Sequence, residues 1–132
     1  MSETVDVHVL PWKVPTPRGL WHRAFVLTER GCFVTPDIDY TMMQSIKAAA
    51  AEGAEEVVRV MTEHGRSKRV QFLPWADITT VRVSPGLGLI EIGGDDRGML
   101  GVKIPDRERL EKVGKALTRI WKARSAESGI EA

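Results

Sequence analysis

The chain has 132 residues, the usual size of one domain and too short for two of ordinary size. It carries 19 basic and 18 acidic residues, and this balance argues against a dedicated nucleic-acid binder, which would have a strong basic excess. A single cysteine excludes an intrachain disulfide and a cysteine-based zinc finger. No apolar run is long enough to cross a membrane, and the N-terminus lacks a signal-peptide pattern, so we expect a cytoplasmic protein.

The N-terminal part of the chain has the pattern of short β-strands. Residues 5–10 alternate apolar and polar side chains with the period of a half-buried strand. Three prolines follow between residues 11 and 17, and we expect a connection or an edge segment there, because proline cannot donate a hydrogen bond to a sheet. Two further strands, at 21–27 and 32–35, would form a hairpin whose turn ends at Gly31.

A helix is predicted over residues 38–52. Apolar residues recur there at spacings of three and four, an alanine run favours helix, and Gly53 can end it. The next segment, 54–63, has two interpretations. Its β-branched residues favour a strand at 56–62, which we prefer, whereas its apolar residues also continue the helical stripe.

From residue 56 onward the pattern predicts an antiparallel meander that ends in a helix. The strands are expected at residues 56–62, 68–73, 79–83, 87–92 and 99–104, separated by turn residues rich in glycine, proline and aspartate. An amphipathic helix follows Pro105, and residues 125–132 are expected to fray. The apolar residues assigned to the core of this part are Trp75, Ile78, Leu110, Val113, Leu117, Ile120 and Trp121.

This order of elements, with two local strings, resembles the bacterial pleckstrin-homology (PH)-like domain family. Residues 72–81 (FLPWADITTV) are similar to its P-W-x-D-I-x-x-V stretch, and residues 25–30 (FVLTER) resemble its L-T-x-x-R hairpin. The resemblance covers residues 21–122 and implies a mainly β (α+β) fold. That fold is a small antiparallel barrel or sandwich of about seven strands, in two orthogonally packed sheets, capped by the C-terminal helix. Residues 1–124 would form this single domain, with a helical insert at 38–52.

No catalytic or metal-binding constellation is evident in the sequence. The three histidines lack metal-ligand spacing, and the paired aspartates at 95–96 are explained by a hairpin turn. Cys32 is expected to be buried; His22 could lie across the hairpin from it, but no third group would orient the pair. We therefore expect neither an enzyme nor a cofactor or metal site.

Two sets of residues are candidates for contact with a partner. In the family that the chain resembles, basic residues of the first strand pair hold the phosphates of lipid headgroups. In this chain, a later predicted hairpin is basic as well. The candidate anion- or lipid-binding residues are Lys13, Arg18, Arg23, Arg66, Lys68 and Arg69. The candidates for an apolar partner surface are Trp12, Trp21, Met42 and Met43.

The C-terminal helix is the most basic part of the chain. Residues 106–124 contain seven basic and three acidic residues, a net charge of +4. Such a face can meet an acidic protein or a nucleic-acid backbone, although the plainer interpretation is a solvated outer face.

PH-like domains bind phosphoinositides, peptides or proteins and rarely catalyse reactions. The resemblance and the lack of a catalytic pattern together predict a non-catalytic binding or assembly module, whose partner is another protein or a second copy of the chain. The alternative is a peripheral module that binds anionic lipid headgroups at a membrane surface through its basic loops. No nucleic-acid partner is expected.

Overall fold

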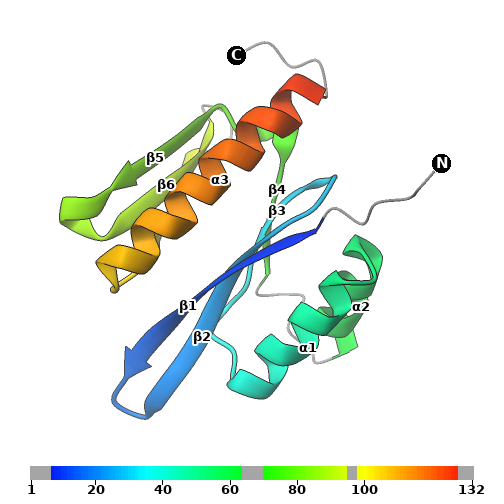
Figure 1. Ribbon diagram of the computed structural model, residues 1–132, viewed down its shortest axis with the longest axis vertical. Coiled ribbons are helices and arrows are strands. Elements are labelled where there is room, and N and C mark those ends of the chain that lie inside the picture. Colours follow the sequence, from blue (N-terminus) through cyan, green and yellow to red (C-terminus); the bar gives the residue numbers. More distant parts are fainter. Residues whose placement is uncertain (1–6, 64–69, 95–97, 128–132) are drawn as a thin grey trace. The chain divides into compact units, whose positions relative to one another are not determined.

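A computed structural model describes residues 7–63, 70–94 and 98–127 (Figure 1). These residues form an α+β structure with two antiparallel sheets, of four and three strands, and three α-helices. The chain divides into two compact units, Met1–Phe72 and Leu73–Ala132, which are described separately below. The elements are β1 (His8–Thr16), β2 (Gly19–Leu27), β3 (Gly31–Val34), α1 (Tyr40–Ala50), α2 (Ala54–Glu63), β4 (Gln71–Pro74), β5 (Thr80–Ser84), β6 (Leu89–Gly94), β7 (Gly98–Lys103) and α3 (Arg107–Glu127).

Strand β1 is an edge strand of the first sheet, whose order is β1-β2-β3-β4. It pairs with β2 along its whole length and runs through Pro11 and Pro15 without a break. These two prolines are four residues apart, so their nitrogens point to the same side of the strand, and the free edge is the side where a missing donor costs no ladder bond. The edge alternative is therefore confirmed, whereas the expected end of the strand at residue 10 is wrong, because β1 continues through Pro11 and Pro15 to Thr16.

The hairpin of β2 and β3 forms where the alternating pattern predicts it, with Leu27 opposite Cys32. Its loop is closed by the buried Thr28. The hydroxyl oxygen of Thr28 accepts hydrogen bonds from the amides of Arg30, at 3.1 Å, and Gly31, at 3.3 Å. The Thr28 amide in turn donates to the Gly31 carbonyl at 2.9 Å. One side chain thus satisfies the backbone groups that the turn leaves unpaired.

The predicted insert helix is present, and a second helix follows it. Asp39 caps the start of α1, its carboxylate accepting a hydrogen bond from the Met42 amide at 2.7 Å. The chain then turns at Gly53, whose φ of +127° is a conformation that side chains disfavour. Residues 56–62 lie in α2, so the preferred strand there is wrong. Val57 and Met61, one helical turn apart, are both buried, and this burial outweighs the β-propensity of the segment.

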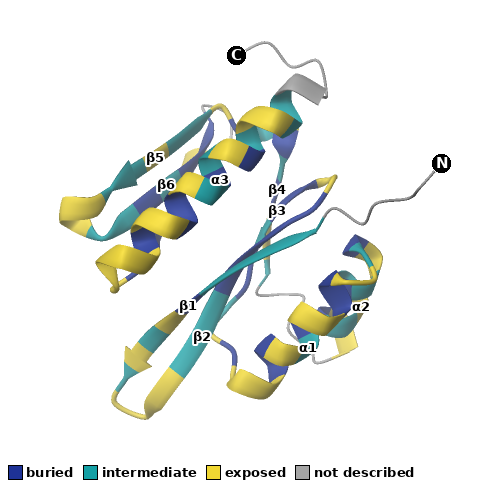
Figure 2. Ribbon diagram, viewed as in Figure 1, coloured by how far each residue is buried: buried dark blue, intermediate teal, exposed yellow. Residues whose placement is uncertain are grey.

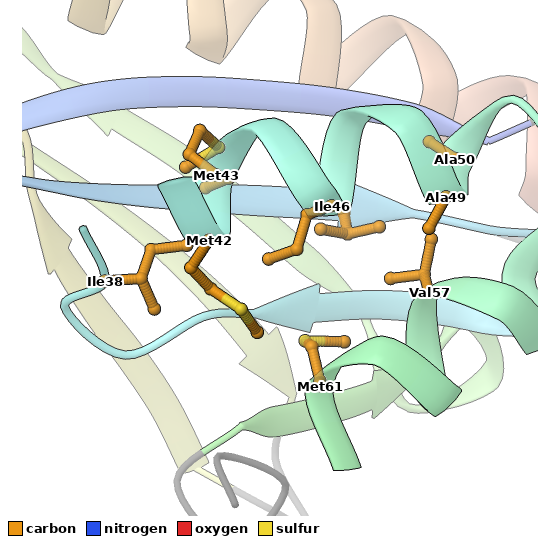
Figure 3. Close-up of a cluster of buried hydrophobic side chains, with 10 residues drawn as sticks. Ile38, Met42, Met43, Ile46, Ala49, Ala50, Val57 and Met61 are labelled. Atoms are coloured by element: carbon orange, nitrogen blue, oxygen red, sulfur yellow. The ribbon is translucent and has the colours of Figure 1, made fainter. Parts of the chain in front are cut away.

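The core of the first unit lies between the two helices and one face of the sheet (Figure 3). It contains Ala24 and Val26 of β2 together with Ile38, Met42, Met43, Ile46, Ala49, Ala50, Val57 and Met61. Met42 and Met43 are only 4% and 1% exposed, so their assignment to an exposed partner surface is wrong. Both lie on the side of α1 that completes this core, and methionine is well suited to filling irregular gaps there.

The second unit is the meander β5-β6-β7 with α3 packed against it. Val83 faces Ile90, which faces Val102, so apolar side chains gather on one side of the sheet. Buried and exposed residues alternate along α3 (Figure 2). Of the residues assigned to the core of this part, Trp75, Ile78, Leu110, Val113, Leu117 and Ile120 are buried, as expected. Trp121 is half-buried, and its indole nitrogen donates to the Ile78 carbonyl at 3.1 Å.

Candidate functional site

Cys32 and His22 do not form a catalytic pair. Cys32 is fully buried, and desolvation raises the pKa of its thiol, so the reactive thiolate is disfavoured. His22 lies five residues before Leu27, the residue of β2 that is opposite Cys32. Its backbone exchanges hydrogen bonds of 2.7 and 2.8 Å with Ile38. Its ring lies 5.9 Å from that of Tyr40. Cys32 faces Leu27, so the expectation that His22 could lie across the hairpin from Cys32 is wrong.

The acidic pair Asp37 and Asp39 has a structural explanation. Asp39 caps α1, and Asp37 forms an ion pair with Arg23 at 3.4 Å. The paired aspartates at 95–96 lie outside the described residues. Within residues 7–63, 70–94 and 98–127, no three histidine, cysteine, aspartate or glutamate side chains gather in a way that could hold a metal ion.

The candidate lipid-binding residues do not all remain available for an anion. Arg23 donates from Nε to the Thr35 carbonyl at 3.3 Å, besides its ion pair with Asp37. Lys13 and Arg18 are exposed, on β1 and in the turn after it. Arg66, Lys68 and Arg69 lie outside the described residues. In the part of the chain that the structure describes, no helix is long and apolar enough to cross a membrane.

The two tryptophans of the β1–β2 hairpin, Trp12 and Trp21, differ in exposure. Trp12 is 2% exposed and packs against Phe25 with ring centroids 5.1 Å apart, so its assignment to a partner surface is wrong. Trp21 is half-buried on β2. With Met42 and Met43 also in the core, the predicted apolar surface retains Trp21 alone among its four residues.

A groove of about 740 Å³ lies in the second unit, between β5 and α3. Successive groove residues on α3 are one or three positions apart, and alternate ones are four apart, which places them along one side of the helix. This side is distinct from the buried stripe that contains Leu110 and Leu117. The groove is lined by Val83 of β5 and by Glu111, Gly114, Lys115, Thr118, Arg119 and Lys122 of α3.

Three contacts fix α3 beside β5. A Cβ atom at Gly114 would lie 2.7 Å from Cγ2 of Val83, so the absence of a side chain permits the close approach. Trp121 ties the last turns of the helix to Ile78, just before β5. At the other end, the amide of Ile104, three residues before the helix, donates to the carbonyl of Gly88, after β5, at 3.0 Å. Helix and strand therefore run in opposite directions (Figure 1).

The groove is positively charged. It is lined by three cations, Lys115, Arg119 and Lys122, called the groove cations below, and by one carboxylate, that of Glu111. Glu111 is itself paired with Arg107 at 3.6 Å. Within the described ranges, none of the groove cations forms an ion pair, whereas the cations elsewhere on α3 include two that do, Arg107 with Glu111 and Lys112 with Glu108. The positive charge on the groove side of α3 is thus not balanced by ion pairs within the described residues, and it would attract an anionic group.

Strand β5 adds an open sheet edge to this groove. In the order β5-β6-β7 it is a terminal strand, and its pairing among the described residues is with β6. Its five residues contain no proline, in contrast to the edge strand β1, where Pro11 and Pro15 remove donors. In the described part of the chain, a strand edge without a second partner and three cations without an ion pair thus belong to the two elements that line the groove, an arrangement that suits an extended, acidic chain segment.

The sequence indicates the basic helix but not the groove cations as a site. The available signal is the spacing of Lys115, Arg119 and Lys122, together with a glycine inside an otherwise regular helical pattern. We compared the chain with protein-family models, with curated proteins and with solved structures. None of the three comparisons finds a match.

Proposed function

We propose that the protein is a non-catalytic module that binds an extended, acidic segment of another protein in the groove between β5 and α3. The observation that carries this proposal concerns residues 7–63, 70–94 and 98–127: among them, the three groove cations form no ion pair, and β5, which contributes Val83 to the groove, has no second partner strand. A bound segment would exchange backbone hydrogen bonds with β5 and place its carboxylates against Lys115, Arg119 and Lys122.

The groove favours a protein segment over a membrane surface. A membrane-binding patch needs cations that project outward together, whereas the groove cations line a hollow beside Val83 and Gly114. In the first unit, Lys13 and Arg18 are exposed, but Arg23 is engaged by Asp37 and Thr35. The lipid-binding alternative therefore serves as a control in the experiment below.

The proposal includes a PH-like scaffold in the cytoplasm. Two antiparallel sheets of four and three strands, followed by a C-terminal helix, agree with the elements that the resemblance implies. If residues 1–124 form one domain, heating should give a single unfolding transition, because the two units would lose their structure together. Differential scanning calorimetry should then yield equal calorimetric and van't Hoff enthalpies. Two resolved transitions would contradict a single domain.

The binding function is tested by reversing the charge of two groove cations. The probes are two capped peptides, acetyl-Thr-Val-Thr-Val-Glu-Glu-Asp-Glu-amide and the peptide with these residues in reverse order. They are titrated into the isotope-labelled full chain and followed by NMR. Wild-type protein should bind at least one of them, with the largest shifts at the amides of β5 and at the groove side of α3. The double variant Lys115→Glu, Arg119→Glu should lose about 10- to 100-fold in affinity, because the loss of both cations removes roughly 1.4–2.8 kcal/mol of binding free energy in total.

A charge-matched variant separates the groove from a general attraction to basic protein. Arg109→Glu with Lys112→Glu makes the same change in net charge on a side of α3 that does not line the groove. Its affinity should fall much less than that of the groove variant, because Arg109 and Lys112 do not line the groove and would act on a bound segment only through solvent. Equal losses in both double variants, or binding of phosphatidylserine vesicles in place of either peptide, would refute the groove as a protein-binding site.

A further inference from the structure

The charges of the groove are unevenly distributed along its length. Its carboxylate, Glu111, lies nearest the start of α3, whereas Arg119 and Lys122 lie towards the end. The eleven residue-to-residue steps from Glu111 to Lys122 span about 16 Å of helix axis, the length of about five residues of an extended strand. A bound segment of this length therefore meets Glu111, which is already paired with Arg107, at one end of the groove and two positive groups at the other.

The contacts of α3 relate this gradient to the direction of β5. Trp121, next to Lys122, bonds to Ile78 just before the first residue of β5. The carbonyl of Gly88, after β5, bonds to Ile104 before the helix begins. The cationic end of the groove thus lies by the start of β5, and the Glu111 end lies by its last residue.

We infer that the bound segment runs antiparallel to β5 and carries its acidic residues in its C-terminal half. This inference rests on the proposed function of the groove. The three-stranded sheet is antiparallel throughout, and an antiparallel addition continues the same hydrogen-bond pattern, whose bonds are slightly more stable than those of a parallel pair. An antiparallel segment begins beside Ser84, near Glu111, and ends beside Thr80, near Arg119 and Lys122.

The middle of the groove adds a second preference. Val83 of β5 and Gly114 of α3 meet there, and neither offers a charge or a hydrogen-bonding side chain. A carboxylate placed directly over this contact would lose water and would have Lys115 as its one cationic neighbour among the groove residues, whereas Arg119 and Lys122 lie together towards the cationic end. The segment therefore takes apolar or small polar residues before its acidic half, in the order of the first peptide described above.

The two capped peptides test this order because they have the same composition and the same charge. Wild-type protein should bind the peptide with the acidic C-terminal half about five- to tenfold more tightly, since its carboxylates avoid Glu111 and meet Arg119 and Lys122. A nitroxide at the N-terminus of that peptide should broaden the amide signal of Ser84 more than that of Thr80. Equal affinities, a preference for the reversed peptide, or broadening centred on Thr80 would overturn the inference.

The variant Glu111→Lys isolates the repulsive end of the groove. It should raise the affinity of the reversed peptide and bring the two affinities within about twofold of each other. Glu108→Lys is the matched control. Glu108 is paired with Lys112 at 3.6 Å, as Glu111 is with Arg107, but it does not line the groove. This control should keep the wild-type ratio, and loss of the ratio in the control would overturn the role of Glu111. If neither peptide binds wild-type protein, the proposed function itself fails.

Discussion

Replacing Gly93 with alanine should lower the free energy of unfolding by about 2–5 kcal/mol. Gly93 has a φ of +145°, and an added Cβ would lie 2.2 Å from the carbonyl oxygen of Gly98 and 3.2 Å from Cα of Met99. Both atoms belong to the backbone of β7, which is held by its pairing with β6. A flexible side chain could move aside, but here the strands themselves must separate. The midpoint and slope of urea unfolding, followed by tryptophan fluorescence, measure the loss.

Gly101→Ala is the control for this prediction in the same pair of strands. A Cβ at Gly101 would meet only Cδ1 of Leu89, at 3.5 Å, an ordinary packing distance. The substitution should leave stability unchanged or raise it by up to about 1 kcal/mol, because glycine loses more conformational freedom on folding than alanine. Equal stability of Gly93→Ala and wild type would mean that β6 and β7 do not approach as closely as described.

The elements that the sequence predicts correctly are those whose patterns are local. Alternating residues define the strands of the second unit to within about two residues, because each strand hides one face against a single helix. The stripe that contains Leu110 and Leu117 identifies α3 for the same reason. In the hairpin of β2 and β3, turn residues restrict the backbone so strongly that the register follows from them.

The segment at 54–63 shows where local pattern is insufficient. A short apolar run with β-branched residues fits a buried strand or one side of a helix, and tertiary packing decides between them. Val57 lies beside Ala49 across the helix pair (Figure 3). The small side chains of the alanine run leave room for α2 to pack against α1. This packing joins two separate segments, so the periodicity of either segment alone does not predict it.

The groove could not be predicted for a related reason. The count of charges on the C-terminal helix is visible in the sequence, but their pairing is not. Arg107 and Lys112 pair with carboxylates one turn away, whereas Lys115, Arg119 and Lys122 line the groove and form no ion pair with any residue that the structure describes. Which cations remain without a paired carboxylate depends on side-chain geometry. Their proposed role depends also on β5 being the end strand of its sheet.

Met43→Ala should lower the free energy of unfolding by about 2–5 kcal/mol, the range for removing a large apolar side chain from a core. Met43 is 1% exposed in the cluster between α1, α2 and the sheet. An exposed partner-surface methionine would give almost no change in stability. Tyr40→Ala, one turn earlier on the same helix, is the control, because Tyr40 is 64% exposed and its removal should cost less than about 1 kcal/mol.

Met43→Leu completes the comparison, since it keeps most of the side-chain volume. It should cost less than about 1.5 kcal/mol, so that the three variants rank by the volume they remove from the core and not by helix propensity. Urea unfolding of the three variants under one set of conditions measures this ranking. If Met43→Ala and Tyr40→Ala lose the same small amount, α1 does not bury its methionines, and the partner surface first assigned to Met42 and Met43 would regain its support.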